Sequence, residues 1–211
     1  HGCNAVEVSK ALDAGIDAVL KHEDGRTNHD VFWEAFCRNM GGEESSWEAL
    51  FNQFYEEEFG RLGANVVPNP AAARAIAALQ AKGYPLVLTT MPLFPHRAVE
   101  WRLQWAGVPP EAFQRLTVYS NSTSVKPKLA YYQENLDAMG LSGEDVLMVG
   151  NNTVEDLAFT QLGADAFLVT DWLLNPSGMD VDEVRHGTME QFAQWVETLP
   201  PCANPATSIQ P

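Results

Sequence analysis

The chain has 211 residues, of which 28 are acidic and 13 are basic, so its formal net charge at pH 7 is −15. A surface that negative repels phosphate backbones and anionic lipid, which argues against a nucleic-acid partner and against a membrane partner. A hydrophobic fraction of 45% fits a globular protein with a real core, and no apolar run reaches the roughly 18 residues that a bilayer span needs.

The first part of the chain, from residue 5 to about residue 62, shows only helical periodicity. Apolar residues recur every three to four positions in three segments, which are Val6–Leu20, Val31–Met40 and Trp47–Phe59. Asn28 or Asp30 is the predicted cap of the second helix, and Ser45 or Ser46 that of the third. No run of β-branched residues interrupts this part, so we predict a small helical bundle.

Aromatic residues in this helical part allow two interpretations. Trp33, Phe36, Trp47 and Phe51 could line a substrate chamber. Aromatic residues at helical spacing more often form core, and we favour that interpretation.

The pattern changes at 66–70, where helices and short apolar strands begin to alternate. Asn69 and Pro70 suit the cap and the first turn of a helix that ends before Gly83. The predicted elements after it are a strand at 86–90, a helix at 97–106, a strand at 116–119, a helix at 127–139, a strand at 146–149, a helix at 154–162, a strand at 166–170 and a helix at 189–199. Short apolar strands that alternate with helices predict a parallel sheet covered on both faces.

Polar residues stand where three of these strands end. The first group is Thr89, Thr90 and Met91, the second lies between Tyr119 and Lys126, and the third is Gly150-Asn151-Asn152. In an open parallel sheet, ligands bind outside the carboxyl ends of the strands, so these groups are the candidate site. Each group alone could be ordinary turn residues.

Taken in order, the groups resemble the motifs of the haloacid dehalogenase-like superfamily. Its second motif is an apolar strand that ends in Ser or Thr, as Val87-Leu88-Thr89-Thr90 does. Its third is a lysine often followed by proline, as in Lys126-Pro127, and its fourth is a strand, a glycine and two acidic residues, matched in part by 146–156. The resemblance covers about residues 5–198.

The resemblance implies a Rossmann-like parallel sheet core with helices on both faces, plus a small all-helical cap domain. We expect the cap at 1–66, the core at 67–199 and a loose proline-rich tail at 200–211. It also implies a phosphatase-type hydrolase that acts on a small phosphorylated substrate. No feature of the sequence predicts the oligomeric state.

The resemblance also assigns roles to the candidate residues. Thr90 would hydrogen-bond the transferring phosphoryl group, and Lys126 would neutralise charge on its oxygens. Asn152, Asp156 and Glu155 would hold Mg²⁺, a hard ion that prefers oxygen ligands. Met91 and Asn151 would contact the substrate.

Three departures from the family pattern bear on activity. No segment matches the first motif, an apolar strand followed by Asp-x-Asp, so we expect that strand to lie before His1 and the 211 residues alone to be inactive. Asn152 stands where the relatives have an aspartate, which predicts a weakened Mg²⁺ site, although asparagine is also a good turn residue. Met91 stands where an asparagine is common.

Two functions therefore stay open, and a third is weak. The leading one is the Mg²⁺-dependent phosphatase, and the alternative is a catalytically impaired relative that binds or regulates. A dinucleotide oxidoreductase is disfavoured because no Gly-x-Gly-x-x-Gly follows a strand.

Cysteine and histidine usage gives the remaining expectations. Cys3, Cys37 and Cys202 form no CxxC pair and indicate reduced thiols in a cytoplasmic protein. The start of the chain has no signal-peptide character. The five histidines do not pair at ligand spacing, so the sequence predicts no transition-metal site.

Overall fold

The computed structural model describes residues 3–211, which divide into two compact units. Unit 1 contains the chain up to Asn65 together with Thr89–Arg102 and Thr117–Val125, and unit 2 contains Val66–Leu88, Leu103–Leu116 and Lys126–Pro211. The first boundary falls where the residue pattern changes, but two later segments return to unit 1. The division into a cap at 1–66, a core at 67–199 and a tail therefore stays a prediction.

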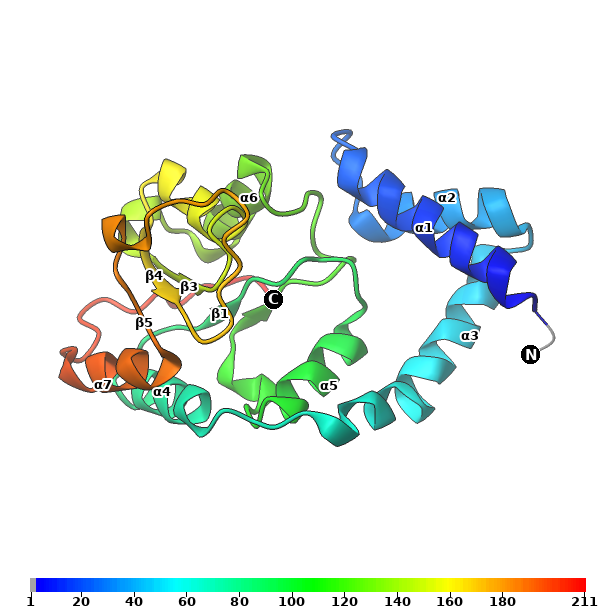
Figure 1. Cartoon of the computed structure of the whole chain (residues 1–211). Coiled ribbons are helices and arrows are strands. Elements are labelled where there is room, and N and C mark those ends of the chain that lie inside the picture. The colour runs from blue at the N-terminus through cyan, green and yellow to red at the C-terminus, as the bar shows by residue number, and fades with distance from the viewer. Residues whose placement is uncertain (1–2) are drawn as a thin grey trace. The chain divides into compact units, whose positions relative to one another are not determined.

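Unit 1 is built from helices, as its periodicity predicts (Figure 1). They are α1 (Ala5–Lys21), α2 (Asn28–Met40), α3 (Glu44–Glu57), the 3-10 helix η1 (Phe59–Asn65) and the first part of α5 (His96–Trp105). The predicted caps of α2 and α3 are wrong. Thr27 caps α2 by accepting a hydrogen bond from the backbone N–H of Asp30, and Glu43 precedes α3 without a side-chain cap.

Aromatic side chains of α2 form the core of unit 1. Trp33 and Phe36 are 1% and 0% exposed, and Trp47 and Phe51 of α3 pack against them. The interpretation of these aromatic residues as core is therefore confirmed. At Gly15 a Cβ atom would lie 2.6 Å from the Phe32 ring, so only glycine allows this close approach of α1 to α2.

Unit 2 contains the strands. Its elements are α4 (Pro70–Ala81), β1 (Val87–Leu88), η2 (Pro110–Ala112), β2 (Arg115–Leu116), α6 (Leu129–Met139), η3 (Gly143–Asp145), β3 (Leu147–Gly150), η4 (Leu157–Leu162), β4 (Asp165–Val169), η5 (Val181–Glu183), β5 (His186–Gly187) and α7 (Met189–Thr198). The predicted start of α4 is confirmed, because the Asn69 side chain accepts from the Ala71 N–H and Pro70 occupies the first turn.

All strand pairs are parallel, but they form two separate sheets. One has the order β1-β2 and the other the order β3-β4-β5. Among the described residues, no strand joins β1 to β3. Val87 of β1 nevertheless packs against the cluster that contains Met148 of β3, so both sheets contribute to one hydrophobic core.

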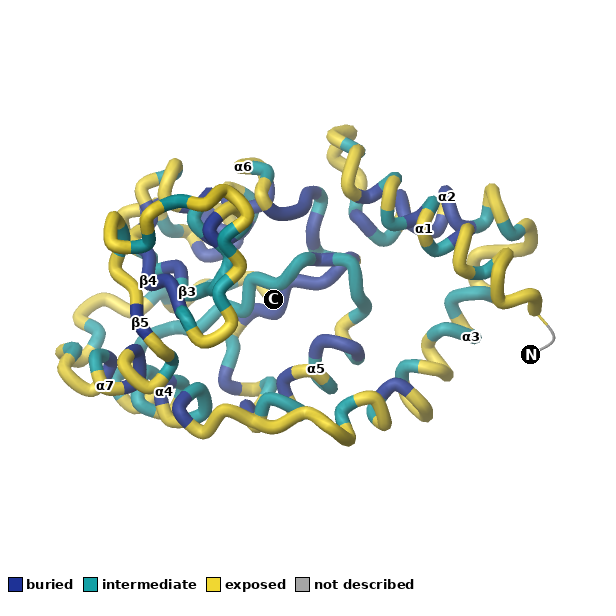
Figure 2. Tube along the Cα trace, viewed as in Figure 1, coloured by how far each residue is buried: buried dark blue, intermediate teal, exposed yellow. Residues whose placement is uncertain are grey.

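Successive residues of β3 enter two different clusters, as expected for a strand covered on both faces. Met148 packs with residues of α6 and η4, whereas Leu147 and Val149 pack with α4 and α7. β4 is buried along most of its length, whereas β3 is mostly of intermediate burial, as Figure 2 shows. The predicted fold class is confirmed: the protein is mixed α/β, with parallel sheets, helices on both faces and a group of helices that precedes them in the chain.

Three parts of unit 2 differ from the sequence expectation. The helix expected at 154–162 is the shorter 3-10 helix η4, and the two-residue strand β5 was not expected. The segment after α7, predicted as loose, has hydrogen bonds at both ends. The Cys202 N–H donates to the Lys82 carbonyl, and the Gln210 N–H donates to the Ala138 carbonyl.

Among residues 3–211, no helix is long and apolar enough to cross a membrane.

Candidate functional site

A buried ion pair lies at the carboxyl end of β3. Lys126 and Asp156 are each 7% exposed, and Nζ of Lys126 lies 2.6 Å from Oδ1 of Asp156. Lys126 comes from the segment before α6, where the Lys126–Pro127 peptide is cis, and Asp156 directly precedes η4. A buried lysine needs such a partner, because an unpaired charge away from water is costly.

The other oxygen of Asp156 organises the turn after β3. Oδ2 accepts hydrogen bonds from the backbone N–H groups of Asn151 and Asn152, both at 2.9 Å. At Gly150 a Cβ atom would lie only 2.2 Å from that oxygen, so the turn requires glycine at this position. Asp156 therefore receives three hydrogen bonds, and the glycine that ends β3 makes room for them.

Asn152 and Glu155 complete the turn. Oδ1 of Asn152 accepts from the backbone N–H groups of Val154 and Glu155, at 3.0 and 3.1 Å. This is the geometry of a turn-forming asparagine. The Tyr132 hydroxyl donates to the Glu155 carbonyl, and burial raises the pKa of that hydroxyl.

A second loop is bonded to this turn. The Asn151 side chain donates to the Trp172 carbonyl, and backbone hydrogen bonds join Leu174 to both Asn151 and Thr153. The Thr153 hydroxyl also donates to Asn175, at 3.0 Å. Sequence reasoning missed this loop, because backbone bonding between two loops leaves no residue pattern.

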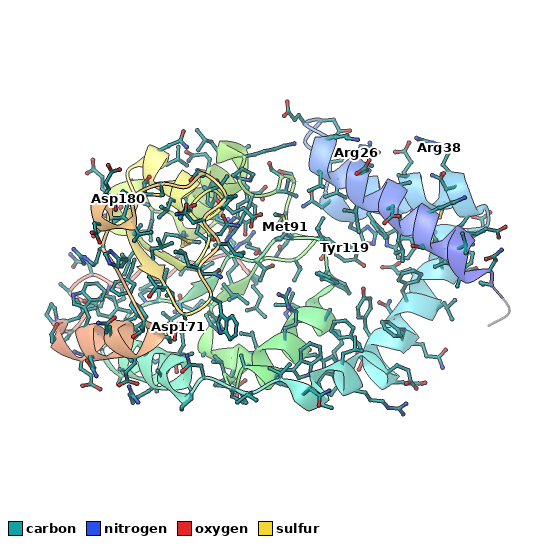
Figure 3. The ribbon with its side chains drawn as sticks, in the orientation of Figure 1. Arg26, Arg38, Met91, Tyr119, Asp171 and Asp180 are labelled. Atoms are coloured by element: carbon teal, nitrogen blue, oxygen red, sulfur yellow. The ribbon has the colours of Figure 1, made fainter. Side chains whose placement is uncertain are left out.

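Thr90 and Met91 belong to unit 1, whereas Lys126 and Asp156 belong to unit 2. The Thr90 hydroxyl donates to the Thr117 carbonyl at 2.9 Å, and the Thr117 hydroxyl accepts from the Thr90 N–H at 2.8 Å. Met91, marked in Figure 3, packs against the aromatic core of unit 1. The phosphoryl contact of Thr90 and the substrate contact of Met91 stay predictions.

The structure thus brings together five of the seven predicted site residues, Lys126, Asn151, Asn152, Glu155 and Asp156. Their donor set does not by itself fit Mg²⁺, which gains most from anionic oxygen ligands. Asp156 supplies one carboxylate, which already pairs with Lys126, and the amide oxygen of Asn152 is engaged in the turn. Glu155 stays a prediction as a ligand.

Structural comparison shows what the fold resembles. A protein described as a predicted phosphoglycolate phosphatase from Haemophilus somnus 129pt is 17% identical, with a TM-score of 0.54 over 90% of this chain and 89% of that one. A HAD phosphatase from Thermococcus onnurineus is 14% identical, with a TM-score of 0.55 over 92% and 80%. The L-2-haloacid dehalogenase from Xanthobacter autotrophicus is 13% identical, with a TM-score of 0.51 over 92% and 83%.

Sequence comparison gives the family. A search of curated protein sequences finds no match to this chain. The family model described as haloacid dehalogenase-like hydrolase matches residues 12–163, which include β1, Lys126, β3 and Asp156. This match covers well over half of the chain and agrees with the parallel sheets and with the structural neighbours. The protein therefore belongs to the haloacid dehalogenase-like hydrolase family.

Proposed function

We propose that this hydrolase acts on phosphoric monoesters and that its substrate is a small phosphorylated metabolite. The buried Lys126–Asp156 pair at the end of β3 carries the proposal. A lysine fixed by a carboxylate is a positioned positive charge, which stabilises the negative charge of transferring phosphoryl oxygens. A phosphoester carries up to about two negative charges at pH 7 and so matches such a lysine well. The phosphatases among the structural neighbours support this choice at the level of the fold.

The reaction needs two carboxylates that no segment of the sequence matches. One attacks phosphorus and forms a phosphoaspartate, and the other protonates the leaving oxygen and then activates water. We propose that a strand with both carboxylates joins the sheet between β1 and β3. Two observations support that position: β1-β2 and β3-β4-β5 are parallel but separate sheets, and Val87 packs with Met148 in one cluster.

One residue of this chain has a defined task in the proposed reaction. Lys126 neutralises charge on the phosphoryl oxygens. Water then cleaves the phosphoaspartate, which releases inorganic phosphate and restores the carboxylate. We propose Mg²⁺ binding only with additional carboxylates from the added strand, because this chain offers too few oxygen ligands for the ion.

The 211-residue chain alone is expected to show no phosphatase activity, since it lacks the nucleophile. The measurement is release of inorganic phosphate from a generic phosphoester, compared with a buffer blank. Turnover that Lys126→Ala abolished would contradict this expectation, because another carboxylate of the chain would then be the nucleophile.

Asn152→Asp is expected to tighten Mg²⁺ binding in a longer protein that contains the Asp-x-Asp strand. Aspartate can accept the same two turn hydrogen bonds, and it adds one negative charge beside the ion. A gain of ~2.8 kcal/mol would tighten binding about a hundredfold. Calorimetry measures the affinity, and the phosphatase rate should rise with it.

The matched control is Asn175→Asp, which adds the same charge to the neighbouring loop bonded to Thr153. An equal gain in both variants would show a general charge effect. No gain in Asn152→Asp would show that this residue only forms the turn.

A second candidate is a non-catalytic binding or regulatory protein. The engagement of Asn152 in the turn and the pairing of Asp156 with Lys126 favour it, because both reduce what is left to hold a metal. The deciding observation is the reading frame before the His1 codon. An apolar strand with Asp-x-Asp there supports the enzyme, and a frame without one supports the binding protein.

We also propose a cytoplasmic location. The sequence has no CxxC pair, and Cys37 and Cys202 form no disulfide among the described residues, which fits a compartment that keeps thiols reduced. Cell fractionation tests this directly, and recovery of the protein outside the cytoplasm would contradict it.

A further inference from the structure

Three side chains with metal-binding atoms converge in unit 1. They are His29, in the first turn of α2, and Glu44 and Glu48, in the first turns of α3, and their ligand atoms all lie within 4.8 Å of one another. The two glutamates stand four residues apart and so share one face of α3. No spacing rule reveals this cluster, since its members come from two helices.

The imidazole of His29 is held in a fixed orientation. Nδ1 lies 3.0 Å from Oδ1 of Asp30, and Nε2 lies 3.1 Å from Oε1 of Glu48. The ring packs edge-on against Tyr119, which Figure 3 marks, with centroids 4.9 Å apart, and the His29 N–H donates to the Tyr119 carbonyl. When Nδ1 donates to Asp30, the lone pair of Nε2 faces the two glutamates. Histidines that bind metals usually donate their other ring N–H to such a carboxylate.

Charge at this place favours a cation. Asp30, Glu44 and Glu48 surround a single imidazole, and the Glu44 carboxylate has no hydrogen bond or ion pair among the described residues. Zn²⁺ takes imidazole nitrogen and carboxylate oxygen as ligands, and with three protein ligands it keeps a fourth position open for water. Imidazole selects transition metals, whereas Mg²⁺ and Ca²⁺ prefer sites made of oxygen alone.

We propose that His29, Glu44 and Glu48 bind one divalent transition-metal ion of the Zn²⁺ class, oriented by Asp30. The ion joins the first turn of α2 to α3, a helix with no fully buried residue of its own. This site lies within unit 1 and is independent of the proposed hydrolase chemistry at Lys126.

The test is calorimetric titration of the full chain with Zn²⁺ alone, followed by the same titration with Mg²⁺. We expect one Zn²⁺ per chain and far weaker binding of Mg²⁺. Asp30→Asn removes the partner that orients the His29 ring and should weaken Zn²⁺ binding about 10- to 100-fold. Glu44→Gln and Glu48→Gln each remove a ligand of the ion and should weaken Zn²⁺ binding at least as much. Glu57→Gln, at the other end of α3, is the matched control and should bind as the unmodified chain does.

Several results would overturn the proposal. One is the absence of Zn²⁺ binding, in which case a protonated His29 alone bridges Asp30 and Glu48. Another is equal Zn²⁺ affinity in Glu44→Gln, Glu48→Gln and the unmodified chain. The absorption spectrum of the Co²⁺-loaded protein tests whether the ion binds at the cysteines instead. A thiolate charge-transfer band would place the ion there and refute the proposed site. Circular dichroism of each variant separates loss of a ligand from loss of fold.

Discussion

Replacing Lys126 with methionine is expected to lower the free energy of unfolding by about 3–5 kcal/mol, the usual cost of removing one partner from a buried ion pair. Methionine has a similar length but no charge, so Asp156 would keep its two backbone hydrogen bonds and lose its cation. Urea unfolding followed by circular dichroism gives the difference.

The matched control makes the same substitution in an exposed pair. On α1, Nζ of Lys21 lies 2.9 Å from Oδ2 of Asp17, and the two side chains are 74% and 66% exposed. Lys21→Met should change the free energy of unfolding by about 0.5 kcal/mol or less, as exposed pairs on helices do. A loss below about 1 kcal/mol for Lys126→Met would show that water reaches the Lys126–Asp156 pair.

The sequence predicted the order of elements well wherever local chemistry decides. Asn69 and Pro70 start α4, and Gly140, with φ at +65°, ends α6, because a cap depends on a few neighbouring residues. The same reasoning was wrong for α2 and α3. The predicted cap of α2, Asn28, lies inside the helix instead. Its side-chain amide donates hydrogen bonds to the carbonyls of Pro92 and Ser124, which are far away in the sequence.

Features set by the rest of the fold could not be read in this way. The residues at 154–162 have helical periodicity, but the three hydrogen bonds to Asp156 and the capping by Asn152 shape a turn first, so only η4 follows. Strand β5 has two residues and therefore no alternation to detect.

The candidate site was predictable in part for the same physical reason. Parallel strands place their carboxyl ends at one edge, so Lys126 and the turn after β3 could be expected together. The sequence did not show that Asp156 organises the turn, or that the side-chain oxygen of Asn152 accepts hydrogen bonds from two backbone N–H groups. Both depend on side-chain direction, which residue types alone do not fix.

Replacing Asn28 with leucine is expected to lower the free energy of unfolding by at least about 2 kcal/mol, since each buried polar group left without a partner costs about 1–3 kcal/mol. Asn28 is 0% exposed, and its side-chain amide donates to the carbonyls of Pro92 and Ser124, at 3.1 and 2.9 Å. Its Oδ1 lies 2.7 Å from Nε2 of His22. The measurement is the midpoint and slope of urea unfolding.

Asn39 on the same helix supplies the control, because among residues 3–211 its side chain donates only to the Ala35 carbonyl one turn earlier. Asn39→Leu should change the free energy of unfolding by no more than about 0.5 kcal/mol. Equal losses in both variants would show that the amide of Asn28 does not hold the loops at Pro92 and Ser124. A large loss for Asn28→Leu alone would identify Asn28 as the residue that fastens both returning segments to the helices of unit 1.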